Sequence, residues 1–205
     1  HPDEGFRRST ALNEAFRQVT GEYCIFMDSD CIPHNHFVAD HWTSRENNVV
    51  LCGRRVDLGE HVSMDLTLQD VGQHHHQRLN LVTILDILRT KTLNWEESIR
   101  LPFPFLGRLI HWKTPSLLGS NFSLEPSLFE RVNGFNEDYI GYGLEDSDLE
   151  HRLRLAGATL KALRHRAIQY HLYHPRNTST STNARVLEET VKRGSPVCPN
   201  GLRKQ

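Results

Sequence analysis

The apolar positions in the first sixty residues follow a helical period and then an extended one, twice in succession. Apolar residues at helical spacing predict a helix over residues 5–20, which Gly21 ends. A short apolar run over residues 23–27 predicts a buried strand. Pro33 then starts a predicted helix that carries Phe37, Val38, His41 and Trp42 on one face, and residues 48–53 form a second apolar run. This order of helix, strand, helix and strand predicts that the two strands are parallel neighbours in an α/β sheet with helices packed on its faces.

The second half of the chain continues the mixed pattern after an irregular middle region. Leu144–Leu155 has the pattern of an amphipathic helix, with Leu149 and Leu153 facing inward. The other predicted elements are a strand within residues 117–124, a helix over 126–131, strands over 159–163 and 167–170, and a helix over 183–192.

Length and composition are those of one folded domain. The chain has 205 residues, with 24 basic and 25 acidic side chains and a net charge of −1, so nothing in its charge favours nucleic acid as a partner. No apolar run approaches the roughly 18 residues of a membrane span. We expect a cytoplasmic protein, with attachment to the inner face of a membrane as the alternative. The four cysteines show no paired spacing, and we expect them to be reduced thiols.

The first motif with chemical meaning follows the strand over residues 23–27. Asp28 and Asp30 come directly after these apolar residues. The carboxyl end of a strand in an open α/β sheet borders the crevice where ligands bind. Carboxylate oxygens suit Mg²⁺ or Mn²⁺, which leave positions open for phosphate oxygens. The plain alternative is a turn or helix cap made by Asp-Ser-Asp.

The second motif is a glycine-rich loop followed by an acidic helix start. Residues 134–143 contain three glycines, and the helix that follows begins with Glu145, Asp146, Asp148 and Glu150. Negative charge at a helix N-terminus is favourable, which explains one or two of these residues. Four neighbouring acids repel each other, so Glu145 and Asp146 are candidate functional residues.

Two groups of histidines invite a metal interpretation. His74, His75 and His76 are adjacent and cannot share one helix face, so we interpret them as a solvated polar turn. His171 and His174 follow the last predicted strand, and for them the alternatives are a metal site and packed or solvated side chains.

Together, these pieces in this order resemble the family 2 glycosyltransferases. The segment Gly134–Leu149 also looks like the corresponding segment of the galactosyltransferase and polypeptide N-acetylgalactosaminyltransferase families, which share the GT-A fold. The resemblance implies a Rossmann-like, mixed and mainly parallel α/β sheet flanked by helices. It covers roughly residues 4–176, so we expect a GT-A domain over 1–176 and a C-terminal surface tail with one helix over 177–205.

The resemblance also implies a donor side of the site. A divalent metal, Mn²⁺ or Mg²⁺, would lie on the diphosphate of a nucleotide-sugar, with a UDP-sugar as the first expectation. The implied metal ligands are Asp28, Asp30 and His174, with His171 as the rival histidine. The implied donor-binding residues are Asp28, Asp30, Gly119, Ser120 and Arg176.

On the acceptor side, the resemblance implies that Asp146 is the general base of an inverting transfer to a saccharide or glycoconjugate, as in polysaccharide biosynthesis. Glu145 and Asn121 are the implied acceptor-binding residues. Trp112 could stack on a sugar or lie in the core. The alternative function is a noncatalytic module that binds a sugar or nucleotide-sugar.

The chain departs from the family pattern before its first strand. Relatives have an earlier region of strands that holds the nucleotide base, whereas here Asp28 arrives after one helix. We therefore expect an N-terminally incomplete domain that lacks the first strands. Such a sheet would have an exposed apolar edge that favours self-association, and the activity of these residues alone would be doubtful.

Overall fold

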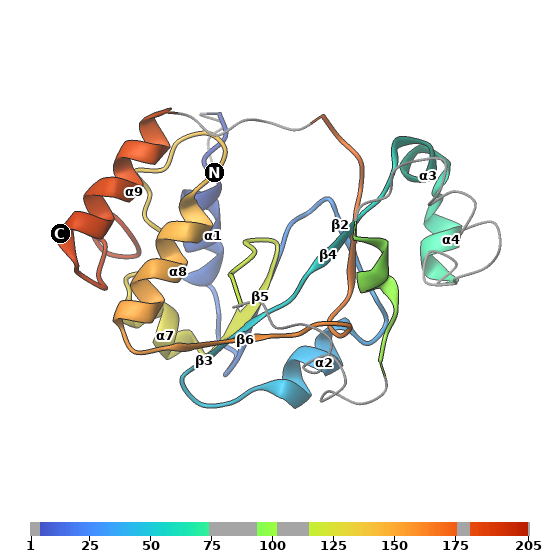
Figure 1. Cartoon of the computed structure of the whole chain (residues 1–205), viewed down its shortest axis with the longest axis horizontal. Coiled ribbons are helices and arrows are strands. Elements are labelled where there is room, and N and C mark those ends of the chain that lie inside the picture. Colours follow the sequence, from blue (N-terminus) through green and yellow to red (C-terminus); the bar gives the residue numbers. More distant parts are fainter. Residues whose placement is uncertain (1–4, 74–93, 102–114, 176–180, 205) are drawn as a thin grey trace.

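The computed structural model describes residues 5–73, 94–101, 115–175 and 181–204. His74 to His76, Trp112 and Arg176 lie outside this part of the chain. The elements, labelled as in Figure 1, are α1 (Arg8–Phe16), β1 (Cys24–Met27), β2 (Cys31–Pro33), α2 (Phe37–Ser44), β3 (Val49–Cys52), β4 (Arg55–Asp57), α3 (Glu60–Asp65), α4 (Leu68–Gly72), the 3₁₀ helix η2 (Trp95–Ser98), β5 (Asn121–Leu124), α7 (Pro126–Arg131), α8 (Glu145–Leu155), β6 (Thr159–Ala162), β7 (Gln169–His171) and α9 (Ser181–Arg193).

The central sheet is mixed. Its strand order is β1-β5-β3-β6, and β3 pairs with β6 in parallel. β5 runs antiparallel to both of its neighbours, β1 and β3. The α/β class with a mixed sheet is confirmed, whereas the expectation of a mainly parallel sheet is corrected, because two of the three pairings between these described strands are antiparallel. The two strands predicted to be parallel neighbours, β1 and β3, are instead separated by β5, which enters between them from much later in the sequence.

Both faces of this sheet are buried, because helices cover each of them. Val50 and Cys52 of β3 pack with Phe16 of α1, Phe129 of α7 and Leu153 of α8. The alternate residues of β3, Val49 and Leu51, pack with Phe37 of α2 on the other face. Successive side chains of a strand point to opposite faces, so a strand covered on both faces must be apolar throughout, as Val49–Cys52 is. Figure 1 shows α1, α7 and α8 on one side of the strands and α2 on the other.

A second, smaller sheet has the order β2-β7-β4. β2 pairs antiparallel with β7, and β4 pairs parallel with it. The apolar pattern did not predict β2 or β4, because each is only three residues long. Pro33 therefore ends a strand, and the helix α2 starts four residues later than Pro33 itself.

The predicted face of α2 is wrong for two of its four residues. Phe37 and His41 are buried, whereas Val38 is 64% exposed and Trp42 is 40% exposed. The buried position next to His41 is occupied by Asp40, whose carboxylate accepts hydrogen bonds from Arg100, Arg166 and the backbone N–H of Ala167. A polar residue with this many donors can replace an apolar one at a buried position.

The C-terminal segment is an integral part of the domain, which corrects the prediction of a surface tail. The predicted helix is present as α9, but the residues after it turn back into the core. Cys198 is fully buried, and the amide of Asn133 donates to the carbonyl oxygens of Cys198 and Arg203 at 2.7 and 2.8 Å. The polar composition of this segment suggested solvent, whereas its backbone supplies the partners that a buried asparagine needs.

Two further observations concern the chain as a whole. All four cysteines are free thiols and buried. In the ranges that the structure describes, no helix combines the length and the apolar composition needed to cross a membrane. Among the described strands, β1 lies at one end of its sheet; self-association through that edge stays a prediction.

A buried ion pair inside α8 anchors the acidic helix to the core. Arg152 and Asp148 are both fully buried, with a nitrogen to oxygen distance of 2.6 Å. Arg152 also donates to the carbonyl oxygens of Val132 and Gly134, at 2.6 and 2.9 Å. Ion pairs with a four-residue spacing usually lie on the surface of a helix. This pair lies in the interior, because α7 and the loop after it cover both side chains.

Replacing Arg152 by Met should leave Asp148 buried without its counter-charge. We expect the free energy of unfolding to fall by about 3–5 kcal/mol, measured by urea denaturation. The matched control is Arg185→Met, which breaks an exposed pair of the same spacing with Glu189 and should cost about 0.5 kcal/mol or less. A similar small loss in both variants would contradict this expectation.

Candidate active site

The segment with the two aspartates is a turn between β1 and β2. The N–H of Cys31 donates to the carbonyl oxygen of Asp28 at 3.2 Å, which closes the turn. The turn and the candidate site therefore occur together, although they were alternatives on the sequence alone. The two carboxylates also contact different groups of side chains, Asp30 a pair of histidines and Asp28 an arginine.

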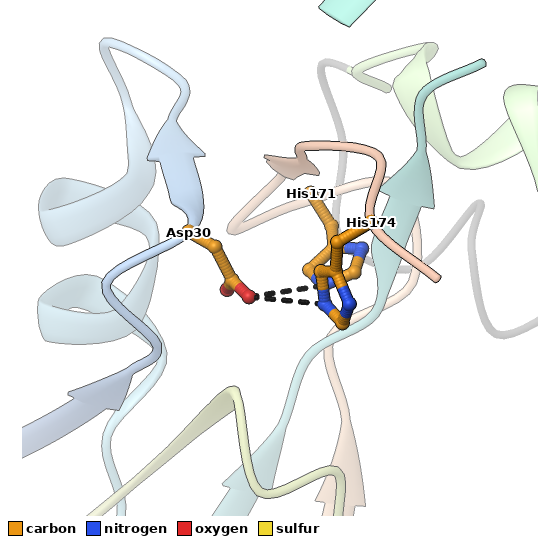
Figure 2. A group of neighbouring side chains, drawn as sticks. All are labelled: Asp30, His171 and His174. Atoms are coloured by element: carbon orange, nitrogen blue, oxygen red, sulfur yellow. Dashed lines mark hydrogen bonds and ion pairs between the residues drawn. The ribbon is translucent and has the colours of Figure 1, made fainter. Parts of the chain in front are cut away.

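Asp30 meets the two late histidines. Its Oδ2 lies 3.4 Å from Nε2 of His171 and 3.3 Å from Nε2 of His174. One ligand atom from each of the three residues lies within 4.8 Å of the others, which could hold a metal ion. Figure 2 shows the three side chains pointing toward one another, Asp30 from the turn and both histidines from the end of β7 and beyond. The structure thus brings together residues more than a hundred positions apart.

Asp28 lies in a second cluster, which Arg8 organises. The guanidinium of Arg8 donates to Asp28 at 2.7 Å and to the carbonyl oxygen of Gly119 at 2.8 Å. It also reaches Glu145 at 3.4 Å, which makes Arg8 the cation between two carboxylates. Among the described residues, the metal-ligand group includes Asp30 and the histidines but not Asp28. The carboxylate of Asp28 is paired with Arg8 instead.

The sequence interpretation missed Arg8, although one signal was available. A helix that packs against a following strand runs opposite to it, so the first turn of the helix lies beside the carboxyl end of the strand. Arg8 is the first residue of α1, and Asp28 follows directly after β1. A basic residue at that helix position therefore predicts a partner for the acid at the strand end.

The acidic start of α8 forms the other wall of the Arg8 cluster. Leu144, directly before the helix, has φ of 75°, a left-handed conformation that is uncommon for a residue other than glycine. Glu145 is buried, whereas Asp146 is half-buried and its Oδ1 accepts a hydrogen bond from the N–H of Ser147 at 2.7 Å. Strained backbone persists where its surroundings hold it in place, and such residues cluster at functional sites.

Burial raises the pKa of Glu145 above its ordinary value, and the neighbouring acids Asp146 and Asp28 add to this rise. The positive charge of Arg8 opposes it. The Oε2 atom of Glu145 is buried without a hydrogen-bond partner. The helix start is therefore a place where a carboxyl group is costly to ionise, which is typical of functional sites.

Three predicted site residues in the segment 119–121 have different environments. Gly119 lies against Arg8, and a Cβ atom there would come within 2.9 Å of the guanidinium. Ser120 is buried and its hydroxyl accepts from Gln169 at 3.1 Å. Asn121 is fully buried. Each of these backbone positions lies close to the site, but the two side chains point into the protein.

The side chain of Asn121 is committed to the protein interior, which corrects its prediction as an acceptor-binding residue. Its amide nitrogen donates to the carbonyl oxygens of Arg54 and Ala167, at 2.7 and 2.8 Å. Its Oδ1 lies 3.1 Å from Nε2 of His41. With both ends of the amide engaged, Asn121 links the central sheet to the loops that lead into β4 and β7.

Four findings place this chain among known proteins. A family profile described as glycosyl transferase family 2 matches residues 1–132, and one described as the N-terminal domain of galactosyltransferase matches residues 109–175. The uncharacterized glycosyltransferase YfnE of Bacillus subtilis (strain 168) is 26% identical over 197 residues, which covers 84% of this chain and 50% of that protein. The crystal structure of GalNAc-T7 with UDP, GalNAc and Mn²⁺ has the same fold, with a TM-score of 0.54 and 13% identity over 90% of this chain and 34% of that one. The chain thus spans half the length of its curated relative.

Glu145→Gln tests the electrostatic state of the acidic helix start. Because the folded-state pKa of Glu145 is raised, its protonated form favours the folded state at low pH, and this contribution is lost as the pH rises through the raised pKa. We expect Glu145→Gln to be more stable than the unmodified protein at pH 8, with the advantage disappearing near pH 4. Thermal unfolding at several pH values measures this. The exposed Glu188→Gln serves as the control, and a Glu145→Gln variant less stable at pH 8 would contradict the assignment.

Proposed function

The chain belongs to glycosyl transferase family 2, and we propose that it transfers a sugar from a nucleotide-sugar to a hydroxyl group of a saccharide or glycoconjugate. The observation that carries this proposal is that two groups of side chains lie side by side. The first group is Asp30, His171 and His174. The second is the acidic start of α8, which Arg8 connects to Asp28. The first group suits the diphosphate side of the reaction, and the second suits the acceptor side.

The three converging residues fit a divalent metal. One carboxylate and two imidazoles combine oxygen and nitrogen ligands, whereas Mg²⁺ prefers oxygen ligands alone. We therefore favour Mn²⁺. A metal bound there would act as a Lewis acid that stabilises the negative charge of the departing nucleoside diphosphate. Three protein ligands would leave coordination positions of the metal that substrate oxygens could fill.

On the donor side, Arg8 and Asp28 act as a pair. Arg8 holds the carboxylate of Asp28 and the backbone of Gly119 in fixed positions. The hydrogen bond from Gln169 to the hydroxyl of Ser120 fixes the same backbone segment from the other side. This arrangement gives the donor sugar a rigid wall, which reduces the entropy lost on binding.

On the acceptor side, Asp146 is the proposed general base. Its half-buried carboxylate can be reached from solvent, unlike that of Glu145, so it can take a proton from an acceptor hydroxyl as this attacks the anomeric carbon. Glu145 is then the proposed acceptor-binding residue. One displacement by an activated hydroxyl inverts the configuration of the anomeric carbon.

The relatives support the donor class. The GalNAc-T7 structure contains UDP, GalNAc and Mn²⁺. By analogy, we propose that this chain binds a UDP-sugar and the same metal. The galactosyltransferase match over residues 109–175 spans both acidic candidates and both histidines, so a hexose is the first donor sugar to test.

Asp30→Ala should remove the carboxylate from the metal group. We expect the affinity for Mn²⁺ in the presence of UDP to fall by about 100-fold or more, since the ligand itself is lost, measured by isothermal titration calorimetry. The exposed Glu188→Ala on α9 removes the same charge away from the site and should bind as the unmodified protein does. Equal Mn²⁺ binding by Asp30→Ala and the control would refute the metal site.

Asp146→Asn should separate binding from chemistry. We expect binding of UDP and Mn²⁺ to be retained, while sugar transfer, measured by UDP release with an acceptor, falls by about 100- to 10,000-fold because the general base is lost. The control is Glu188→Gln. Transfer by Asp146→Asn at the unmodified rate would exclude this residue as the base, and transfer absent in every variant would favour a noncatalytic binding module.

A further inference from the structure

His171 occupies the point where the three strands of the smaller sheet come into register. In the strand pairing, it lies opposite Cys31 of β2 on one side and opposite Asp57 of β4 on the other. Cys31 is the residue after Asp30, so the same register that brings His171 to Asp30 also brings it to Asp57. Backbone hydrogen bonds lock this alignment, because the N–H of Leu172 donates to the carbonyl oxygen of Asp30 at 2.9 Å and that of Leu58 to His171 at 2.9 Å.

The two nitrogens of the His171 ring face different carboxylates. Nε2 lies toward Asp30 and His174, in the candidate metal group. Nδ1 lies 3.2 Å from Oδ1 of Asp57 on the opposite side of the ring. Asp57 Oδ1 is itself buried and lies 2.8 Å from Nε of Arg55, which fixes its position. Asp57 does not belong to the metal-ligand group of the described residues.

The requirements of metal binding assign the ring protons. An imidazole binds a metal through a nitrogen lone pair, so Nε2 of His171 must be free of hydrogen and the ring proton must lie on Nδ1. Asp57 offers a carboxylate oxygen 3.2 Å from that nitrogen. His174 has an acceptor of a different kind, because its Nδ1 lies 2.9 Å from the carbonyl oxygen of Pro175. Both rings can therefore present Nε2 lone pairs to the same point.

This arrangement would be repulsive without a cation. The two Nε2 atoms lie 3.2 Å apart and both face Oδ2 of Asp30, so three acceptors would converge once the Nδ1 atoms carry the ring protons. A bound metal ion would turn this repulsion into coordination by the three residues. His171 is the better fixed of the two ligands, since its side chain is 12% exposed and that of His174 is 44% exposed.

We infer that Asp57 is a positioning residue of the metal site, which holds His171 through Nδ1 so that its Nε2 faces the metal. Arg55 in turn holds Asp57. The inference rests on the proposed function, because both concern the same metal. It goes beyond that function by adding a residue that does not touch the metal or the substrate. It also makes His171 the anchored ligand and His174 the more exposed one.

The experiment compares Mn²⁺ affinity in the presence of UDP for the unmodified protein, Asp57→Ala, Asp57→Asn and the control Glu188→Ala, by calorimetry and by the electron paramagnetic resonance of free Mn²⁺. Loss of an outer carboxylate that orients a histidine ligand typically weakens metal binding by about 10–100-fold, which we expect for Asp57→Ala. Asp57→Asn keeps the shape and one acceptor oxygen, so it should remain folded and lose affinity to a smaller extent. Thermal unfolding without metal verifies the folded state of each variant.

A second readout does not depend on the metal. Two-bond ¹H–¹⁵N NMR spectra distinguish which ring nitrogen carries the proton, and His171→Gln identifies the signal. Without metal, a proton on Nε2 of the more exposed His174 relieves the repulsion between the two rings. We therefore expect the Nδ1–H form of His171 in the unmodified protein and a mixture of both forms in Asp57→Ala.

The outcomes separate the two proposals. If the unmodified protein binds Mn²⁺ and a folded Asp57 variant binds it equally well, or if the ring proton of His171 is unaffected, Asp57 has no positioning role and the proposed function stands. If the unmodified protein binds no Mn²⁺ with UDP present, the metal-dependent function fails and the inference fails with it.

Discussion

The pairing of β7 with both β2 and β4 is the constraint on which the candidate site depends. It aligns His171 with the residue after Asp30 and with Asp57, so one register sets the position of a carboxylate, an imidazole and the acceptor behind that imidazole. Side chains alternate along a strand, so a shift by one residue would turn His171 away from both carboxylates. The apolar residues Val56, Ile168 and Tyr170 are buried together behind this sheet and oppose such a shift.

Electrostatics is arranged differently in the two halves of the site. Around Asp30, two imidazole nitrogens lie near the carboxylate in a group that could hold a metal ion. Around Asp28 and Glu145, the chain supplies the cation itself, in the form of Arg8. The first half can therefore respond to metal and diphosphate, whereas in the second half one guanidinium already offsets part of the charge of two carboxylates. A metal-responsive half beside a half that Arg8 holds in place is consistent with positioning as a main source of catalysis.

The sequence predicted the positions of helices and strands better than it predicted which strands pair with each other. Apolar runs such as residues 49–52 identify buried strands because both faces of the sheet are covered, and Leu149 and Leu153 identify the inner face of α8 for the same reason. The insertion of β5 between β1 and β3 could not be seen, since pairing between distant strands leaves no local pattern. The joint placement of Asp30, His171 and His174 followed from a family resemblance, whereas Arg8 and Asp57 act through contacts across the fold. Asn121 is the converse case, a residue that was assigned to the site but belongs to the interior. Its side chain donates hydrogen bonds to buried carbonyl oxygens instead of binding a ligand.

The sequence separation within the site has a kinetic consequence. Arg8 and Glu145 are 137 residues apart, and among the described strands β1, next to Asp28, pairs with β5 from much later in the chain. Contacts between distant segments cost loop entropy before they stabilise anything, so they form slowly and late in folding. Helices and local turns can be complete while the donor and acceptor halves are still separate. Ligand binding would then be acquired at the end of folding, after the recovery of helical content, and it would serve as the stricter marker of a correctly refolded molecule.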